Sequence, residues 1–263
     1  MLIAKMPNGD PEIYTAVQGE GPSSNKLVVF VRLSSCNLQC NFCDTAYTWF
    51  FQPSPKAKGL PIMHKYAKPV WRSEYMMEMG PKQVADEIIK LAGPHFKRVV
   101  FTGGEPMLQQ KEIMEAVNYL KADYHHWDVE VETNGTVKVM PDCKFMDQIN
   151  CSPKLASSGN KKEARDNPVV IAQFLKLWRD AKLHHLSFKF VIQPEHLEDD
   201  LAEVEEWEKT HGIPRSLIYL MPEGITEDRI KHGTTVLMDI CRERGYQFCT
   251  RLHVLLYGDK RAV

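Results

Sequence analysis

The sequence lacks several features that would assign it to a specialised class of protein. Its longest apolar runs, such as residues 27–31, are far shorter than the ~20 residues that a membrane-spanning helix needs. Its formal net charge is −1, from 33 Lys and Arg against 34 Asp and Glu, so it has no basic excess of the kind that nucleic-acid-binding domains carry. It contains no internal repeat and no low-complexity tract. These absences leave an ordinary globular protein, in agreement with a hydrophobic fraction of 43% and a charged fraction of 25%.

Cysteine is scarce, and its distribution argues against an extracellular disulfide framework. There are 7 cysteines, an odd number, and three of them are bunched together. Residues 1–7 have neither a long apolar core nor a small-residue cleavage site, so we expect no secretory signal. We expect a cytoplasmic protein, because a reducing compartment keeps thiols free.

The three bunched cysteines form the most informative stretch of the chain. Cys36, Cys40 and Cys43 have the spacing C-x3-C-x2-C, and no fourth cysteine or histidine follows nearby. A structural zinc site has four protein ligands, and a cubane iron–sulfur cluster is also usually held by four thiolates. Three thiolates in one loop therefore predict a cluster with one iron left open to another ligand. Two alternatives stay open at this point, namely buried thiols without a metal and a zinc ion with a distant fourth ligand.

Strands and helices alternate along most of the chain. The patterns predict strands at 26–33, 98–101, 129–131, 145–150, 186–192, 217–220 and 248–255, and helices at 111–120, 169–178, 201–207 and 225–244 with a further helix opened by Pro81. This alternation is typical of an α/β protein with a parallel sheet. Residues 49–80 contain four prolines and show no such pattern, and residues 157–166 read as a loop. We therefore expect one domain over residues 1–263, with 49–80 as an irregular insertion of unknown role.

The unusual residues share one position in this pattern, just past the C-terminal ends of the predicted strands. They are the cysteine motif, Gly103-Gly104-Glu105-Pro106, Glu132 with Asn134, Ser152-Pro153-Lys154, and Gln193. In parallel α/β barrels and open α/β sheets, the loops at that edge converge and form the active site. Five such loops predict the mouth of a barrel, ringed by the cluster and the groups that serve it.

With the cysteine loop and the Gly-Gly-Glu-Pro turn identified, the sequence resembles the radical S-adenosylmethionine superfamily. In that superfamily C-x3-C-x2-C holds a four-iron four-sulfur cluster, whose open iron binds the amino and carboxylate groups of S-adenosylmethionine. Gly103 and Gly104 have no Cβ, so their backbone could approach the methionine end of the nucleotide closely. The cofactor supplies the radical step, and the protein orients it.

A closer resemblance, which covers most of the chain, is to the 7-carboxy-7-deazaguanine synthase family. The motifs that carry it are Val17-Gln18-Gly19-Glu20-Gly21, Phe30-Val31-Arg32, Cys43-Asp44-Thr45, Thr102-Gly103-Gly104, Glu132-Thr133-Asn134-Gly135, Ser152-Pro153-Lys154 and Leu252-His253-Val254-Leu255-Leu256-Tyr257-Gly258. The resemblance implies a homodimer and an incomplete α/β barrel of the TIM type, with about six parallel strands and fewer helices than usual. Residues 49–80 do not match the compact core of that family.

The resemblance also implies a reaction. The expected enzyme is a carbon–nitrogen lyase of queuosine and 7-deazapurine biosynthesis. A 5′-deoxyadenosyl radical starts the conversion of 6-carboxy-5,6,7,8-tetrahydropterin to 7-carboxy-7-deazaguanine, by ring contraction and loss of ammonia. The implied cofactors are the 4Fe-4S cluster, S-adenosyl-L-methionine, which is regenerated, and Mg²⁺. A flavodoxin-type electron donor is the expected protein partner, with no nucleic acid and no membrane.

Matched motif by motif, the resemblance assigns residues to each of these groups. The cluster ligands are Cys36, Cys40 and Cys43, and the Mg²⁺ ligand is Thr45. The residues expected to bind S-adenosylmethionine are Phe42, Asp44, Gly104, Glu132, Ser152, Pro153, Lys154 and Gln193. Those expected to bind the pterin are Val17, Gln18, Gly19, Glu20, Arg32, Thr102 and the terminal carboxylate of Val263.

Several of these residues also have a structural interpretation. Arg32 could form an ion pair within the protein, because a buried charge must be paired; we favour the substrate carboxylate as its partner, which suits a guanidinium. Thr45 could cap a helical turn, and Val263 could be a frayed chain end. The remaining cysteines lack cluster spacing and are expected to be core or surface thiols; they are Cys143, Cys151, Cys241 and Cys249.

Two rival functions stay open on the sequence alone. A glycyl-radical-enzyme activase shares the cysteine motif, but such enzymes often carry additional ferredoxin-like cysteine sets, which this sequence does not contain. A non-enzymatic rival is a zinc-stabilised binding module that uses the three cysteines and one histidine. Metal content distinguishes the zinc module, because a cubane cluster requires about four irons per chain.

Overall fold

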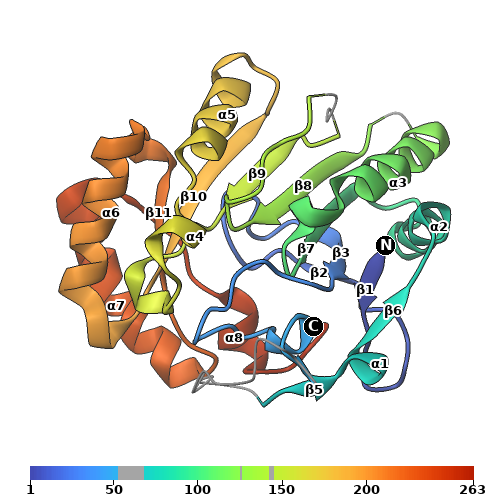
Figure 1. Cartoon of the computed structure of the whole chain (residues 1–263), viewed down its shortest axis with the longest axis horizontal. Coiled ribbons are helices and arrows are strands. Elements are labelled where there is room, and N and C mark those ends of the chain that lie inside the picture. The colour runs from blue at the N-terminus through green and yellow to red at the C-terminus, as the bar shows by residue number, and fades with distance from the viewer. Residues whose placement is uncertain (53–67, 125, 142–144) are drawn as a thin grey trace.

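A sheet of 10 strands organises the part of the chain that the structure describes, which is residues 1–52, 68–124, 126–141 and 145–263 (Figure 1). The structure is a computed structural model. The sheet order is β12-β11-β10-β9-β8-β7-β3-β1-β6, and β2 also pairs with β3. Its strands are β1 (Leu2–Ala4), β2 (Ile13–Val17), β3 (Leu27–Leu33), β6 (Met76–Glu78), β7 (Arg98–Gly103), β8 (Asp128–Thr133), β9 (Gln148–Cys151), β10 (His185–Ile192), β11 (Ile218–Pro222) and β12 (Gln247–Phe248).

The strands from β3 to β12 wind in one direction. Each strand from β7 onward pairs in parallel with the preceding strand of the sheet, so the order along the sheet follows the order along the chain. Winding of this kind builds a barrel, whereas a doubly wound sheet reverses its strand order in the middle. Within the described residues, the two ends of the sheet, β12 and β6, do not pair with each other. The expected incomplete barrel with about six parallel strands is confirmed, with β12 as a short seventh strand.

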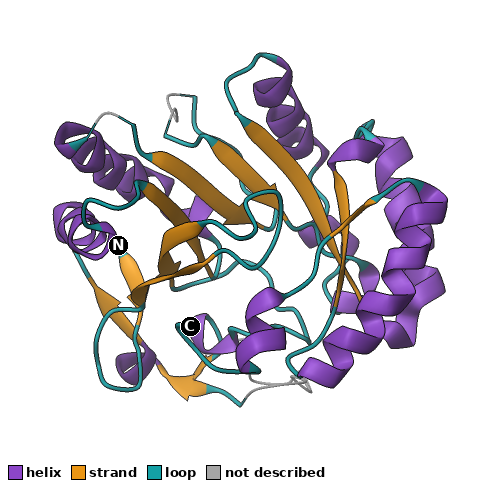
Figure 2. Ribbon diagram, turned by 180° about the vertical axis from the view of Figure 1, so that it is seen from behind, coloured by secondary structure: helices purple, strands orange, loops and turns teal. Residues whose placement is uncertain are grey.

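The helices surround the strands, as Figures 1 and 2 show from opposite sides. They are α1 (Arg72–Tyr75), α2 (Pro81–Ala92), α3 (Gln110–Asp123), α4 (Lys162–Arg165), α5 (Pro168–Arg179), α6 (Leu197–His211), α7 (Glu227–Arg244) and α8 (Leu252–Tyr257). Between β8 and β9 the described residues contain no helix, in agreement with the reduced helix number expected. None of the helices in the described ranges has the length and apolarity that a membrane crossing requires.

Strand β3 lies inside the sheet and is buried along almost all of its length. Val28, Val29, Val31 and Leu33 are fully buried, which explains the continuous apolar run in the sequence. A strand covered on both faces needs apolar residues at successive positions. Each buried side chain of this kind contributes about 1.5–3 kcal/mol. The cysteine loop therefore begins at the end of a buried strand inside the sheet.

Helix α2 illustrates how the sequence defines an outer helix. Pro81 occupies the first helical position, where its missing N–H costs no hydrogen bond, and this predicted start is confirmed. Val84, Ala85 and Ile88 are buried, as the helical spacing of apolar residues predicts. Gly93 ends the helix with a φ of 55°, a conformation that favours glycine.

The prediction of a final strand over residues 248–255 is wrong. Only Gln247–Phe248 pairs with β11, and Leu252–Tyr257 forms helix α8. The pairing of β11 with β12 ends at Leu220, and Pro222, two residues further on, has no N–H to extend that pairing. The chain instead turns towards the first loop, where the N–H at the start of α8 donates to Gly19 O at 3.3 Å. Helix α8 consequently lies at the open end of the barrel (Figure 1).

Residues 49–80 contain more regular structure than the sequence predicts. Their described part includes the pair β4 (Phe51–Gln52) and β5 (Val70–Trp71), helix α1, and strand β6, which pairs antiparallel with β1. The expected loop at 157–166 also contains the short helices η3 (Ala156–Ser158) and α4. Cys143, expected to be an unliganded thiol, lies outside the described residues.

Candidate active site

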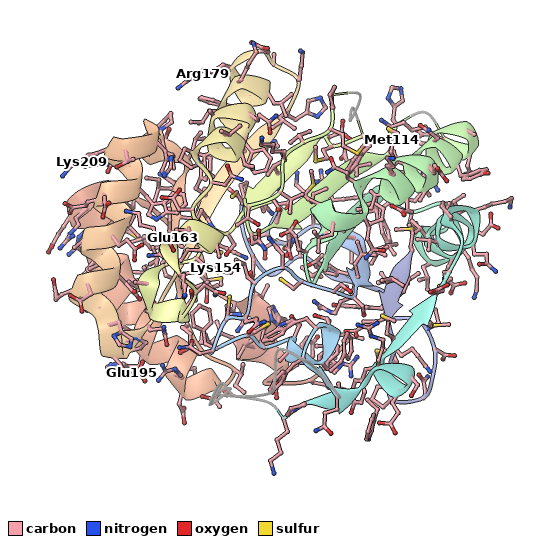
Figure 3. All side chains as sticks on the ribbon, viewed as in Figure 1. Met114, Lys154, Glu163, Arg179, Glu195 and Lys209 are labelled. Atoms are coloured by element: carbon pink, nitrogen blue, oxygen red, sulfur yellow. The ribbon has the colours of Figure 1, made fainter. Side chains whose placement is uncertain are left out.

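A cavity of about 270 Å³ opens where the parallel strands end. Most of the residues assigned to ligands from the sequence line it: Val17, Gln18, Gly19, Glu20, Arg32, Cys36, Cys40, Phe42, Cys43, Asp44, Thr45, Thr102, Gly104, Glu132, Ser152, Lys154 and Val263. Figure 3 shows Lys154 near the middle of the molecule, whereas Arg179 and Lys209 lie at its rim. The folded chain therefore brings these loops together, as the regular position of the motifs after strands predicts.

Two of the assigned residues do not line the cavity. Pro153 is buried between Ser152 and Lys154. Gln193 is also buried, and its side-chain Nε2 donates to Ser157 O at 2.8 Å, while its backbone N–H donates to Asp200 Oδ2 at 2.9 Å. In this structure the side chain of Gln193 is hydrogen-bonded to the loop that follows β9 and stabilises its position.

The three motif cysteines all face the cavity as free thiols. Burial raises the pKa of Cys36 to about 12 and that of Cys40 to about 11, and it also raises the pKa of Cys43. Burial therefore favours the protonated thiols, and a metal that binds these sulfurs has to displace the protons.

The chemistry of the three thiols fits an iron–sulfur cluster. Cys36, Cys40 and Cys43 line the same cavity, and each thiolate of a cubane cluster binds a different iron atom. Three soft sulfur donors at one cavity would therefore hold a cluster with one iron open to another ligand.

The turn Gly103-Gly104 lies directly against the start of the cysteine loop. A Cβ on Gly104 would lie 2.0 Å from Ser35 O, and a Cβ on Gly103, which has a φ of 114°, would lie 2.2 Å from Leu33 O. Gly104 N–H donates to Leu33 O at 2.9 Å. Both glycines are required for the contact between the end of β7 and the cysteine loop, a role that the sequence did not reveal.

Glu105 joins this turn to the loop after β8. Its carboxylate is fully buried and accepts hydrogen bonds from Met107 N–H at 2.9 Å, Thr133 Oγ1 at 2.7 Å and Asn134 N–H at 2.7 Å. Burial raises the pKa of Glu105, while these donors favour its ionised form. The Glu of the Gly-Gly-Glu-Pro turn thus fixes the relative position of two loops that line the cavity.

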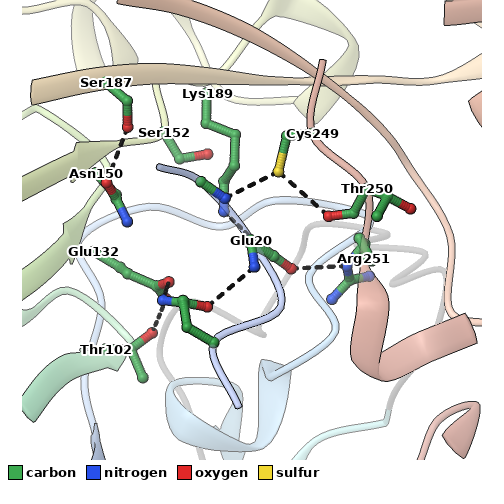
Figure 4. Close-up of polar contacts among 12 residues, drawn as sticks. Glu20, Thr102, Glu132, Asn150, Ser152, Ser187, Lys189, Cys249, Thr250 and Arg251 are labelled. Atoms are coloured by element: carbon green, nitrogen blue, oxygen red, sulfur yellow. Dashed lines mark hydrogen bonds and ion pairs between the residues drawn. The ribbon is translucent and has the colours of Figure 1, made fainter. Parts of the chain in front are cut away.

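Glu20 lies between two cations at one wall of the cavity (Figure 4). Lys189 and Arg251 both pair with its carboxylate, Arg251 through Nε at 3.1 Å. Although burial opposes ionisation, these two cations hold the pKa of Glu20 well below its usual range. Arg251 also pairs with Asp44 in the cysteine loop. One guanidinium therefore connects the loop between β2 and β3, which carries Glu20, with the cysteine loop.

A second polar network forms the floor of the cavity. Gln18 Nε2 donates to Glu130 Oε1 at 2.8 Å and to Glu132 Oε1 at 3.1 Å, and Thr102 Oγ1 donates to Glu132 Oε2 at 2.6 Å. Burial, with the neighbouring Glu132, raises the pKa of Glu130 to about 7. Glu132, assigned to the nucleotide from the sequence, therefore contacts two residues assigned to the pterin.

Arg32 forms the ion pair that its structural interpretation predicts, and it also lines the cavity. Its Nε donates to Glu12 Oε1 at 2.8 Å and one terminal nitrogen donates to Tyr14 Oη at 3.0 Å. Glu12 additionally accepts from Tyr47 Oη at 2.9 Å and pairs with Arg261 near the end of the chain. The contacts of Arg32 with Glu12 and Tyr14 involve Nε and one terminal nitrogen, and the residue lines the cavity.

Thr45 and Val263 both line the cavity. Thr45 precedes the short helix η1 (Ala46–Thr48), and its hydroxyl lies 3.7 Å from Cys43 Sγ rather than capping the helix among the described contacts. Val263 is half-buried. Lys154 Nζ donates to Ser152 Oγ at 2.9 Å, which orients the side chains of this loop at the cavity.

Sequence reasoning missed several charged residues of the cavity. Lys189, Arg251, Glu12 and Arg261 all line it and pair with residues from distant segments. One signal was available, because Lys189 is a charged residue between Phe188 and Phe190 in strand β10, and a buried charge must find a partner. The partner, Glu20, is brought to Lys189 only by the tertiary structure, so no local sequence pattern identifies it.

Comparison with known proteins identifies the class to which this fold and site belong. The family model described as the radical SAM superfamily matches residues 31–208. The chain therefore belongs to the radical SAM superfamily, which uses a 4Fe-4S cluster and S-adenosylmethionine. The donor set around the cavity fits that cluster.

Relatives narrow the assignment within the superfamily. The 7-carboxy-7-deazaguanine synthase of Rhodopirellula baltica is 30% identical over 260 residues, covering 95% of this chain and 86% of the relative. That of Pyrobaculum aerophilum is 31% identical over 254 residues, covering 95% of both chains. The crystal structure of QueE from Escherichia coli shares the fold with a TM-score of 0.59, at 20% identity, covering 96% of this chain and 95% of that one. The chain belongs to the 7-carboxy-7-deazaguanine synthase family, and neither the activase nor the zinc module is favoured.

Proposed function

We propose that this protein is a 7-carboxy-7-deazaguanine synthase, which converts 6-carboxy-5,6,7,8-tetrahydropterin to 7-carboxy-7-deazaguanine with loss of ammonia. The observation that carries the proposal is the similarity to relatives with this name over 95% of the chain. The cavity supports it, since the cysteine motif and a separate set of charged and polar residues face the same space.

The cluster side of the cavity would hold the nucleotide. Cys36, Cys40 and Cys43 are the proposed cluster ligands. The other residues proposed to bind S-adenosylmethionine are Phe42, Asp44, Gly104, Glu132, Ser152 and Lys154. Pro153 and Gln193, which do not line the cavity, are proposed to position the loop that follows β9. When bound together, these groups supply the radical that removes a hydrogen atom from the substrate. The protein residues orient the nucleotide and exclude water from the buried site.

The opposite side would bind the pterin. The guanidinium of Arg32 is suited to the substrate carboxylate, and the ionised carboxylate of Glu20 is suited to accept from the N–H groups of the aminopyrimidinone. The terminal carboxylate of Val263 is the proposed second acceptor. The other proposed pterin contacts are Val17, Gln18, Gly19 and Thr102. Burial of Glu20 between Lys189 and Arg251 supports this role, because its charge is retained in a desolvated site.

Further proposed features concern the metal, the partners and the location. Thr45 would be a Mg²⁺ ligand, with substrate oxygens and water completing the coordination, as is usual for this ion. Its hydroxyl, which caps no helix, supports this role. We also propose a cytoplasmic homodimer that receives electrons from a flavodoxin-type donor.

Anaerobic turnover tests the proposed function. Protein reconstituted with iron and sulfide would be supplied with reductant, S-adenosylmethionine, Mg²⁺ and the carboxytetrahydropterin. We expect a product with the mass of 7-carboxy-7-deazaguanine together with ammonia, and about four irons per chain. Nucleotide cleavage without formation of that product would contradict the proposed substrate while leaving the superfamily assignment intact.

A further inference from the structure

Two cysteines of the cluster motif have a side-chain N–H group directed at their sulfur. Trp49 Nε1 lies 3.3 Å from Cys43 Sγ, and Asn160 Nδ2 lies 3.3 Å from Cys40 Sγ. Trp49 follows the short helix η1, whereas Asn160 belongs to the loop before α4, more than a hundred residues further along the chain. Two unrelated segments therefore supply the same kind of contact to the same loop.

The direction of both hydrogen bonds follows from other contacts. An indole nitrogen can only donate, so the Trp49 contact is an N–H···S bond. Asn160 Oδ1 accepts from Gln39 N–H at 2.9 Å, which requires that its amide nitrogen point to Cys40. Both donors are partly buried, where a hydrogen bond is stronger than in water.

The third cysteine has a weaker contact of the same kind. Asn134 Nδ2 lies 3.9 Å from Cys36 Sγ. Asn134 Oδ1 accepts from Thr136 N–H at 3.0 Å, so here too the amide nitrogen faces the sulfur. At this distance the bond contributes less, and the argument rests on the two contacts at 3.3 Å.

We propose that Trp49 and Asn160 are positioning residues that set the reduction potential of the cluster. Hydrogen bonds to cluster sulfurs are one of the factors that set the potential of iron–sulfur proteins. Reduction adds negative charge to the cluster and its thiolates, and an N–H donor stabilises the more negative state. Loss of either donor therefore lowers the potential and makes the cluster harder to reduce. The proposal rests on the superfamily's cluster and extends beyond the proposed reaction.

The test separates the N–H group from the packing of the ring. Trp49→Phe keeps an aromatic ring next to Phe50, to which the indole is tilted by 40° at 5.4 Å between ring centroids, and it removes the N–H donor. The matched control is Trp127→Phe, because Trp127 is a buried tryptophan whose Nε1 has no hydrogen-bond partner among the described residues. Both variants and the parent protein would be reconstituted, assayed for iron, and titrated anaerobically without nucleotide, with the reduced cluster followed by electron paramagnetic resonance.

We expect Trp49→Phe to bind as much iron as the parent and to titrate at a more negative potential, whereas Trp127→Phe titrates like the parent. An unshifted Trp49→Phe protein with a full cluster would overturn the proposal for Trp49. Asn160→Asp retains the oxygen that holds Gln39 and replaces the donor, so it too should shift to a more negative potential; an unchanged or higher potential would overturn the proposal for Asn160.

A measurement on the parent protein keeps the proposal falsifiable if a variant fails to assemble its cluster. Protein containing tryptophan labelled with ¹⁵N in the indole ring should show a hyperfine coupling of ¹⁵N to the reduced cluster, and absence of this coupling would contradict the Trp49 contact. Potential shifts without any 7-carboxy-7-deazaguanine in the turnover assay would support the present proposal and reject the proposed function. The two failures are therefore distinguishable.

Discussion

Glu12 is a buried carboxylate that three side chains from distant segments share. These side chains are Arg32 in β3, Tyr47 in η1 and Arg261 near the end of the chain, and all three contact the Glu12 carboxylate. A buried carboxylate is tolerated only when it is paired and hydrogen-bonded. At the residue scale, the ion pairs of Glu12 therefore join segments of the cavity wall that come together only in the folded chain.

The first prediction concerns the cluster ligands. Cys40→Ala should reduce cleavage of S-adenosylmethionine by more than ~100-fold, because even groups outside the ligand set cost 10–100-fold at metal sites. Cys241→Ala is the matched control, since Cys241 is a buried thiol of α7 that lies outside the cavity lining and whose Sγ donates to the backbone oxygen of Gln247. The measurement is 5′-deoxyadenosine formed anaerobically per chain. Normal cleavage by Cys40→Ala would refute the cluster assignment.

The second prediction concerns Glu130, whose pKa is raised to about 7 by burial and by Glu132. The unfolded chain releases this proton near the ordinary value of 4.5, whereas the native protein retains it up to about 7. The native state therefore binds more protons in this interval, and the contribution of Glu130 to stability is present below pH 4.5 and lost as the pH rises through 7. The loss amounts to about 3 kcal/mol at most.

Glu130→Gln removes this titration and keeps the shape of the side chain. Its amide nitrogen can donate to Ser23 Oγ, which contacts Glu130 Oε2 at 2.5 Å in the parent. The unfolding free energy of the variant, measured with denaturant between pH 5 and pH 8, should rise relative to that of the parent as the pH increases. A difference that is constant with pH would show that Glu130 does not titrate in this range.

The sequence identifies some residues of the cavity and not others. The cysteines and the motif residues after strands could be identified because they stand out locally from the strand and helix patterns. Lys189 and Arg251 could not, because their importance comes from sharing Glu20, which lies more than 160 residues away along the chain. Charged residues have a local signal only where they interrupt an apolar run.

At the scale of elements, the turn after β7 is the most constrained part of the site. The third prediction is that Gly104→Ala displaces the cysteine loop, because the new Cβ would lie 2.0 Å from Ser35 O, which is backbone and cannot rotate away. Overpacking of this kind costs about 1–3 kcal/mol or more. The variant should unfold at a lower denaturant concentration than the parent. It should also bind less iron per chain than the parent does on reconstitution.

The control for this variant is Gly80→Ala. Gly80 precedes α2, has a negative φ of −69°, and the nearest atom to its new Cβ would be the flexible Gln83 Oε1 at 3.4 Å. Its stability should stay within ~0.5 kcal/mol of the parent, as for an ordinary surface change. Equal iron content in Gly104→Ala and the parent would mean that the loop tolerates the displacement.

Helices and strands could be predicted from the sequence where a local residue pattern determines the secondary structure. The run at β3 predicted a strand buried on both faces, and Pro81 predicted the start of α2, because in both cases the residues concerned determine the outcome themselves. Helix α8 was predicted as a strand, since its apolar residues fit either structure over so short a length. Its conformation depends on where β11 ends and on a bond to Gly19, which are tertiary facts.

At the scale of the whole molecule, the C-terminal tail contacts the N-terminal segment beside the cavity. Arg261 donates to Lys5 O at 2.8 Å, pairs with Glu12, and lies over the Tyr47 ring at 3.7 Å from its centroid. These contacts hold the tail so that Val263 lines the cavity. The same Glu12 also holds Arg32, so the tail and the proposed substrate guanidinium share one anchor.

The last prediction follows from this anchor. Arg261→Gln should release the tail, because a neutral amide retains neither the ion pair with Glu12 nor the cation–ring contact. Val263 should then become accessible to carboxypeptidase, and the KM for the pterin should rise by about tenfold, equivalent to ~1.4 kcal/mol. Uncoupled cleavage of S-adenosylmethionine should be unchanged, because the cysteine loop keeps its own contacts. Residues added after Val263 should have the same effect, since they move the proposed carboxylate away from the substrate.

Arg242→Gln provides the matched control, because Arg242 pairs only with the exposed Asp239 among the ion pairs of the described residues. It should leave carboxypeptidase sensitivity and the KM unchanged, since surface ion pairs contribute little. If Arg261→Gln resisted carboxypeptidase as the parent does, the anchor would lie elsewhere in the tail. If the tail were released and the KM stayed the same, the terminal carboxylate would not bind the pterin, and Glu20 would be the remaining candidate acceptor.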